Sequence, residues 1–351
     1  MIFPTNFLWG ASTSAFQVEG GYNEGGKGVA TTDLGARRPG IADNKVAADH
    51  YHHWKEDVDL MAELGLKVYR MGFSWSRIMP DASGQSNPEG LAFYDKLIDY
   101  LLEKGIEPLV TLYHFECPQA LVDAFGGWLD RKMIDAYLKY AEVCFTHFKG
   151  RVKRWVTVNE QLIATAAGIM NGNFEQDKQK NLQNIYQMSY HVSLAEHRAI
   201  SLLRQINPEA QIGPVCAIQV VYPQSSRSED VLAAENAEEL MEFYLLDLSV
   251  RGEYPPYVAS YLKSHGLYPQ TLPGDAAVLK ASTPDFIGIS AFAPKSRRVP
   301  STTTSRPSGC RTPSTSVIIP TCAKPSGWIR ALTRWACILG CARSIIATVC
   351  P

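Results

Sequence analysis

Acidic residues are missing from the last part of this 351-residue chain. Its last glutamate is Glu253 and its last aspartate is Asp285, so all 35 Asp and Glu lie in the first 285 residues. Nine Lys and Arg follow Asp285 and give that part a net charge of +9, against −10 for the residues before it. A reaction that needs carboxylates must therefore take them from residues 1–285.

Long apolar runs are missing as well. No stretch approaches the ~18 residues of a membrane span. The opening MIFPTNFLWGASTS lacks the basic segment and apolar core of a signal peptide. The net charge of −1 gives no reason to expect nucleic acid or a membrane as a partner. We expect a cytoplasmic protein that binds a small molecule, and the sequence leaves the oligomeric state open.

Cysteine is sparse up to residue 295, which is typical of proteins from reducing compartments. Three cysteines are scattered through this part and five crowd the rest, namely Cys310, Cys322, Cys337, Cys341 and Cys350. The same last part is rich in Ser, Thr, Pro and Arg and has no hydrophobic period, which is typical of a linker. A sharper interpretation is a truncated chain with an out-of-frame tail. We predict a folded part, 1–295, and an irregular, non-native tail, 296–351.

Strand-like and helix-like stretches alternate up to about residue 292. The predicted strands are FLWGASTSAF, KVYRMGFSW, EPLVTLYHF, RWVTVNE, QIGPVCAIQV and PDFIGIS. A helix is predicted over 87–105, with Pro88 near its start and Gly105 at its end, where these residues are favoured. Six such units predict an α/β protein with a parallel sheet, either open and doubly wound or part of a (β/α)8 barrel.

Polar residues at the strand ends favour the barrel. Arg70, His114, Asn159 and Glu160 lie at or near the carboxyl ends of predicted strands. In a barrel these ends converge on one mouth, where catalytic residues belong, whereas an open sheet would spread them along an edge. We therefore predict an incomplete (β/α)8 TIM barrel with about six strand–helix units.

The stretch RWVTVNEQ ends in two adjacent polar residues, Asn159 and Glu160. Strict alternation along a strand points neighbouring side chains to opposite faces. Both side chains reach one pocket only if the strand end is irregular, for instance bulged. The sequence therefore predicts an irregular end to this strand.

Five motifs carry a family resemblance. They are NFLWGASTSAFQVEGG, DHYHHWKEDVDLMAELGLKVYRMGFSWSRIMP, TLYHFECPQAL, TVNEQ and DFIGIS. In this order they resemble glycoside hydrolase family 1, over residues 1 to about 295. The resemblance implies retaining hydrolysis of β-glucosides or 6-phospho-β-glucosides, with no cofactor and no metal. The stretch YHFECP looks more like the 6-phospho-β-glucosidases.

The resemblance also implies roles for single residues. Glu160 resembles the general acid/base, which protonates the leaving oxygen and later deprotonates water. Arg70 resembles the arginine that keeps the nucleophilic carboxylate ionised, because a nearby positive charge lowers a carboxyl pKa. Gln17, His114 and Asn159 resemble residues that bind the sugar hydroxyls, with Asn159 at the 2-hydroxyl. Taken singly, a surface Glu, a core His and a structural ion-paired Arg are the plain alternatives.

The chain departs from the family at three places. The family nucleophile is a Glu in a Thr-Glu-Asn-Gly motif on the seventh strand, and this sequence has no such motif. Gln161 stands where the family usually has Pro, which leaves the chemistry intact. Ser290-Ala291-Phe292 replaces Asn-x-Tyr. We expect the chain to have no significant activity. The alternatives are a non-catalytic sugar-binding barrel remnant, a non-functional truncated product, or a barrel enzyme of different chemistry.

Two other patterns suggest ligands. The stretch GYNEGGKG at 21–28 nearly matches a phosphate-binding loop but lacks the Ser or Thr after Lys27. Three histidines at 50–53 have no second cluster of metal ligands nearby in the sequence. We therefore expect neither a phosphate loop nor a metal site.

Overall fold

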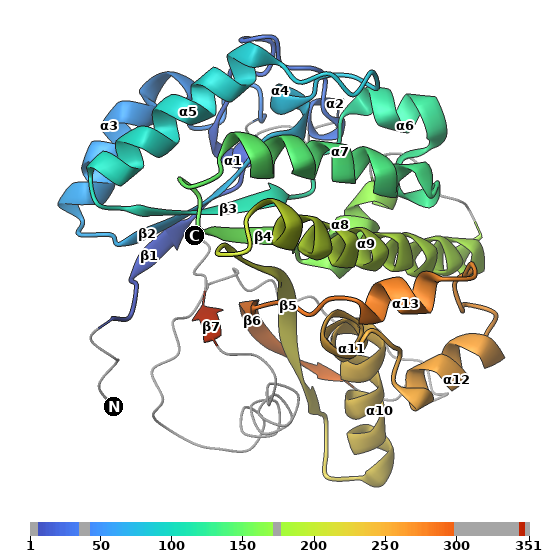
Figure 1. Ribbon diagram of the computed structural model, residues 1–351. Helices are drawn as coiled ribbons and strands as arrows, with labels where there is room; N and C mark the ends of the chain where they lie inside the picture. Colours follow the sequence, from blue (N-terminus) through green and yellow to red (C-terminus); the bar gives the residue numbers. More distant parts are fainter. Residues whose placement is uncertain (1–5, 35–42, 171–176, 298–343, 348–351) are drawn as a thin grey trace.

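The computed structural model describes residues 6–34, 43–170, 177–297 and 344–347, and its centre is one parallel sheet (Figure 1). The strands follow the order of the sequence, β1-β2-β3-β4-β5-β6-β7, and each pairs in parallel with the next. Their bounds are β1 (Gly10–Ser12), β2 (Val68–Gly72), β3 (Glu107–Tyr113), β4 (Arg154–Asn159), β5 (Gln211–Pro223), β6 (Phe286–Arg297) and β7 (Ser344–Ala347). A doubly wound sheet reverses its strand order at a switch point. The unbroken order confirms the predicted incomplete (β/α)8 barrel.

Helices cover the outside of this sheet (Figure 1). Four long ones connect consecutive strands, namely α3 (His50–Glu63), α5 (Pro88–Glu103), α7 (Lys132–His147) and α9 (Lys178–Ile206). Shorter ones are α1 (Ala15–Val18), α2 (Thr31–Leu34), α4 (Trp75–Ile78), α6 (Gln119–Phe125), α8 (Gln161–Met170), α10 (Ser228–Glu238), α11 (Tyr244–Arg251), α12 (Pro256–Ser264) and α13 (Asp275–Lys280). A 3₁₀ turn spans Gly127–Leu129 and a π-helical turn spans Glu239–Phe243.

Local sequence signals explain where α5 begins and ends. The Asn87 side chain accepts a hydrogen bond from the Glu89 backbone N–H, and Pro88 occupies the first turn, where its missing N–H costs nothing. After the helix, Gly105 has a φ of 70°, a left-handed conformation that suits glycine. The predicted helix over 87–105 is confirmed.

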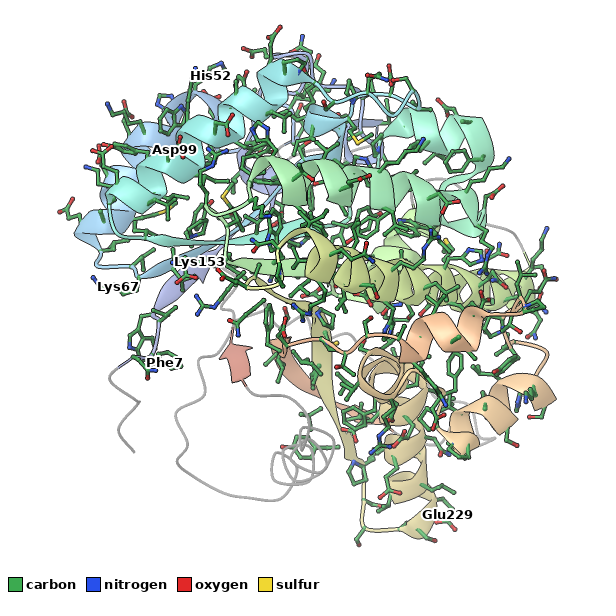
Figure 2. The ribbon with its side chains drawn as sticks, in the orientation of Figure 1. Phe7, His52, Lys67, Asp99, Lys153 and Glu229 are labelled. Atoms are coloured by element: carbon green, nitrogen blue, oxygen red, sulfur yellow. The ribbon has the colours of Figure 1, made fainter. Side chains whose placement is uncertain are left out.

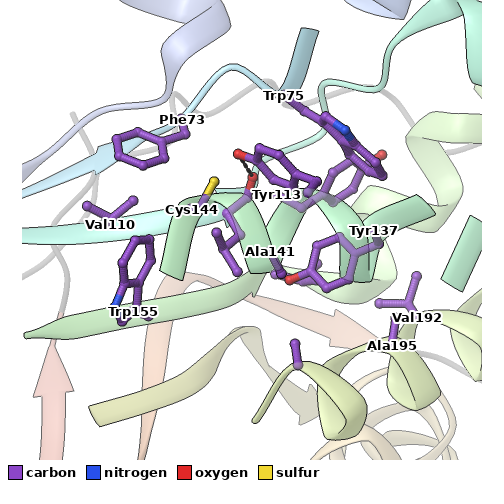
Figure 3. Close-up of a cluster of buried hydrophobic side chains, with 14 of the residues drawn as sticks. Phe73, Trp75, Val110, Tyr113, Tyr137, Ala141, Cys144, Trp155, Val192 and Ala195 are labelled. Atoms are coloured by element: carbon purple, nitrogen blue, oxygen red, sulfur yellow. Dashed lines mark hydrogen bonds between the residues drawn. The ribbon is translucent and has the colours of Figure 1, made fainter. Parts of the chain in front are cut away.

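One apolar layer fills the space between the sheet and the helices. Figure 3 shows its centre, where Val110 of β3 and Trp155 of β4 belong to the same buried cluster as Ala141 of α7 and Val192 and Ala195 of α9. One face of α7 packs into this layer, where Ile134, Ala141 and Phe145 are buried together with Phe148, which directly follows the helix.

A second apolar layer lies on the other face of the sheet. It consists of Leu109, Val156, Val215 and Phe286, with Val68 packed against them. Strands β2 to β6 each contribute one residue. Inward-facing side chains that form a common layer are the interior of a barrel. The sheet is therefore curved around these residues.

Strand β7 is a difference from the predicted irregular tail. It pairs in parallel with β6, from Phe286 with Ser344 to Ile289 with Ala347. The run SIIATV, at 344–349, is one of two short β-branched stretches in the tail that suit a strand, and β7 covers its first four residues. The other stretch, SVIIP, lies outside the described residues.

A buried ion pair fixes the loops after β1 and β2. Arg77 Nε donates to Glu19 Oε2 at 3.1 Å, and the Tyr94 hydroxyl donates to Glu19 Oε1 at 2.6 Å. Arg77 also donates to the backbone carbonyls of Gly20 and Gly21. The charges are thus paired and hydrogen-bonded, as burial requires.

Charged residues lie where the strands begin, at the amino-terminal end of the sheet. Figure 2 labels Lys67 and Lys153, which directly precede β2 and β4.

Among the helices of the described ranges, none combines the length and the apolar character needed to cross a bilayer.

Candidate active site

The carboxyl end of β4 is bulged. Its register with β5 runs from Val156 opposite Gly213 to Asn159 opposite Val215, so three steps on β4 match two on β5. The extra residue lets Val156 face the interior layer while Asn159, three positions later, also reaches the inner face. The predicted irregular strand end is confirmed.

Glu160 follows the bulge in a left-handed conformation, with a φ of 47°. A non-glycine residue in this region costs about 1–3 kcal/mol, so the surroundings must hold it. Its N–H donates to the Val215 carbonyl at 2.6 Å, and its carbonyl accepts from the Ala164 N–H at 2.9 Å. The side chain is buried, with only 6% of the residue exposed.

Arg70 joins three strands. It lies on β2 and is 1% exposed. Its Nε donates to Thr111 Oγ1 of β3 at 2.9 Å, and its Nη2 donates to Asn159 Oδ1 of β4 at 2.6 Å. Because the amide oxygen of Asn159 accepts from Arg70, the amide nitrogen is the end that offers donors to a ligand.

The protonation states follow from burial and from the charge of Arg70. Burial raises the pKa of Glu160 above its ordinary value, and the Ser290 hydroxyl and the Arg70 guanidinium offset part of this rise. Burial, and secondarily the positive charge of Arg70, holds the pKa of His114 well below 6.5. Glu160 thus favours the acid form more than a free carboxyl does, and His114 is a neutral imidazole with one donor and one acceptor.

The predicted sugar-contact residues differ in how far they are buried. His114 directly follows β3, is buried, and meets the ring of Phe16 edge-on at 6.1 Å between centroids. Gln17, on α1 beside Phe16, is exposed and accepts from the Ser14 hydroxyl at 2.6 Å. Within the described residues, no hydrogen bond joins Gln17 to Arg70 or Asn159. Among the predicted residues, all of which the structure describes, the one side-chain hydrogen bond joins Arg70 to Asn159.

Three participants were not predicted from the sequence. Thr111 accepts from Arg70, Ser290 is close enough to Glu160 to affect its pKa, and Gln161 is buried beside it. A threonine inside the apolar run PLVTL is the signal that would have identified Thr111. The partners of Ser290 and Gln161 come from distant segments and leave no local signal.

Comparison with known proteins points to one family. The family described as "Glycosyl hydrolase family 1" matches residues 1–336, beyond the predicted limit of about 295. The aryl-phospho-β-D-glucosidase BglC of Bacillus subtilis is 42% identical over 83% of this chain and 61% of its own length. The β-glucosidase 42 of Arabidopsis thaliana is 40% identical, with the same two coverages. The chain therefore spans about three fifths of the length of these curated relatives.

A solved structure is similar over the same part of the chain. A β-glucosidase from Thermotoga maritima in complex with glucoimidazole superposes with a TM-score of 0.74 at 32% identity, over 83% of this chain and 67% of that one. The family match covers most of the chain and the fold agrees with it. This chain belongs to glycosyl hydrolase family 1.

Proposed function

We propose that this chain carries the acid/base half of a retaining β-glycosidase site, with Glu160 as the acid/base. The observation that supports this best is the grouping at the carboxyl ends of β2 and β4. There the Arg70–Asn159 hydrogen bond lies beside a buried Glu160 whose pKa is raised. Catalytic residues of barrels occupy this end of the strands.

Each residue suits its step. A glutamic acid with a raised pKa protonates the leaving oxygen, and the resulting carboxylate then takes a proton from water. The Asn159 amide nitrogen binds the 2-hydroxyl, where hydrogen bonds strengthen in the transition state. His114, being neutral, donates to one sugar hydroxyl or accepts from another, and Gln17 offers an amide to the same ring.

We further propose that this chain does not turn over glycosides, because its sequence lacks the Thr-Glu-Asn-Gly motif of the family nucleophile. Retention needs a second carboxyl about 5–5.5 Å from the first, and no Glu follows Glu253. The last acid, Asp285, lies at the amino-terminal end of β6. It accepts from Arg204 and from the Ile212 N–H. It therefore faces away from the mouth where Glu160 lies.

The proposed substrates are 6-phospho-β-glucosides or β-glucosides. The names of the two relatives divide between these classes, since one is an aryl-phospho-β-D-glucosidase and the other a β-glucosidase. The aligned part is nearly equally similar to both. The motif YHFECP favours the phosphorylated class.

Assays with aryl β-glucosides and their 6-phosphates test the proposal. We expect the purified chain to release no more aglycone than its Glu160→Ala variant. Turnover that exceeds this control would mean that another residue serves as nucleophile. Titration with glucoimidazole separates the alternatives, because a sugar-binding remnant binds it without turnover and a non-functional product does not bind.

We also propose that residues 1–295 form the folded unit, to whose edge β7 of the tail is added, and that the protein resides in the cytoplasm. The tail has the composition of a linker, and Cys117, Cys144 and Cys216 are buried free thiols. Limited proteolysis should leave a stable fragment of about 295 residues. A full-length chain that resists protease would contradict the two-part division, and cell fractionation tests the location.

A further inference from the structure

We propose that a polar stripe on α9, formed by Ser189, Ser193 and Glu196, positions the Asn159–Glu160 pair from behind the sheet. The members are spaced by four and three residues, so they share one face of the helix. The functional meaning of this inference rests on the proposed role of Glu160. The contacts that support the inference are independent of that role.

The stripe is buried although it is polar. Ser189, Ser193 and Glu196 are all less than 4% exposed. An apolar residue at these positions would satisfy the core equally well, and buried polar groups need partners. The partners of this stripe lie on both sides of Asn159 and Glu160.

One anchor lies before the pair. The Thr157 hydroxyl donates to Glu196 Oε1 at 2.7 Å, and the Tyr137 hydroxyl donates to the Thr157 carbonyl at 2.8 Å. Thr157 lies within the bulge between Val156 and Asn159. Thr157, in the bulge, is therefore hydrogen-bonded to α9 through its side chain and to α7 through its backbone carbonyl.

The other anchor lies directly after the pair. Gln161 is 4% exposed, and its Nε2 donates to the Ser189 carbonyl at 2.6 Å and to Ser193 Oγ at 2.7 Å. Ser189 Oγ is in turn 3.1 Å from the Tyr244 hydroxyl of α11. Gln161, the first residue of α8, is thus hydrogen-bonded to α9, and α9 is hydrogen-bonded to α11.

Only three residues, 158–160, separate the two anchored positions. Within them the backbone leaves the regular strand and then adopts the left-handed conformation of Glu160. Both departures cost free energy and persist only when the surroundings fix them. Removing one anchor should let the backbone relax and carry the Glu160 carboxyl toward water. We class Gln161, Ser193 and Glu196 as positioning residues.

The test measures the Glu160 carboxyl itself. Protein labelled with ¹³C at the glutamate carboxyls is titrated by NMR, and the Glu160 signal is assigned from the Glu160→Gln variant. We expect Gln161→Ala to lower the pKa of Glu160 by roughly half a unit or more, toward its ordinary value. Ser193→Ala should shift it less in the same direction, and Glu196→Gln, which keeps the acceptor Oε1, should leave it unchanged.

Tyr190→Phe is the matched control. It removes a hydrogen bond from α9 to Asp275, away from β4, and should not move the signal. A folded Gln161→Ala or Ser193→Ala protein with the wild-type pKa at Glu160 would overturn the inference. If Gln161→Ala does not fold, the pKa of Glu160 in the less disruptive Ser193→Ala variant decides whether the inference holds. The titration reports the position of Glu160 whatever its role, so failure of the proposed function would appear only in the glycoside and glucoimidazole experiments.

Discussion

The Nη2 atom of Arg70 on β2 donates a 2.6 Å hydrogen bond to Oδ1 of Asn159 on β4, across the intervening strand β3. Residues 89 positions apart in the sequence are thereby fixed side by side at the carboxyl end of the sheet. The bond depends on the β4 bulge, because regular alternation from Val156 would turn Asn159 to the outer face.

Replacing Arg70 with Met should raise the pKa of Glu160 further. The positive charge of Arg70 is one of the two influences that lower this pKa, and methionine removes the charge while keeping much of the volume. NMR titration of the labelled carboxyl checks the direction. A fall in the pKa would show that Arg70 acts on Glu160 mainly by excluding water.

Replacing Arg77 with Leu should destabilise the fold by about 3–5 kcal/mol, because it leaves the buried Glu19 carboxylate without its charged partner. Urea unfolding gives the value. Lys280→Ala is the control, since its ion pair with Glu253 is mostly exposed and such pairs contribute at most about 1 kcal/mol. Equal losses in the two variants would contradict the structural role given to Arg77.

Glu196 should make the stability of the fold depend on pH. Burial raises its pKa to about 8, so the folded chain keeps this proton at pH values where the unfolded chain has lost it. The folded state binds more protons in this range, and stability therefore falls as the pH rises from about 5 to about 8. The neutral Glu196→Gln variant lacks this loss. Its stability relative to the wild type should increase across the range in urea unfolding at several pH values, and parallel curves would contradict the assignment.

The features predicted correctly from the sequence are those set by neighbouring residues. Pro88 and Gly105 mark the limits of α5, and the adjacency of Asn159 and Glu160 in a strand-like run indicates the bulge. The barrel followed from polar residues at strand ends. These signals are local, so a single sequence is enough to detect them.

The missed features depend on distant contacts. Strand β7 exists through its pairing with β6. Gln161 looks like a neutral replacement until α9 brings Ser189 and Ser193 to it. None of these partners lies near enough in the sequence to leave a pattern.

The central claim is that Glu160 is the acid/base, and its most direct test is the dependence of Glu160→Gln on the leaving group. The measurement needs a nucleophile, and we expect a chimera that continues residues 1–295 with the corresponding C-terminal part of BglC to supply it. We predict that Glu160→Gln lowers kcat/KM by about 10²–10⁴ for alkyl β-glycosides, whose leaving oxygen needs a proton. The glycosylation step with dinitrophenyl glycosides should be nearly unaffected, because that leaving group departs as an anion. An equal loss on both substrates would contradict the assignment of Glu160.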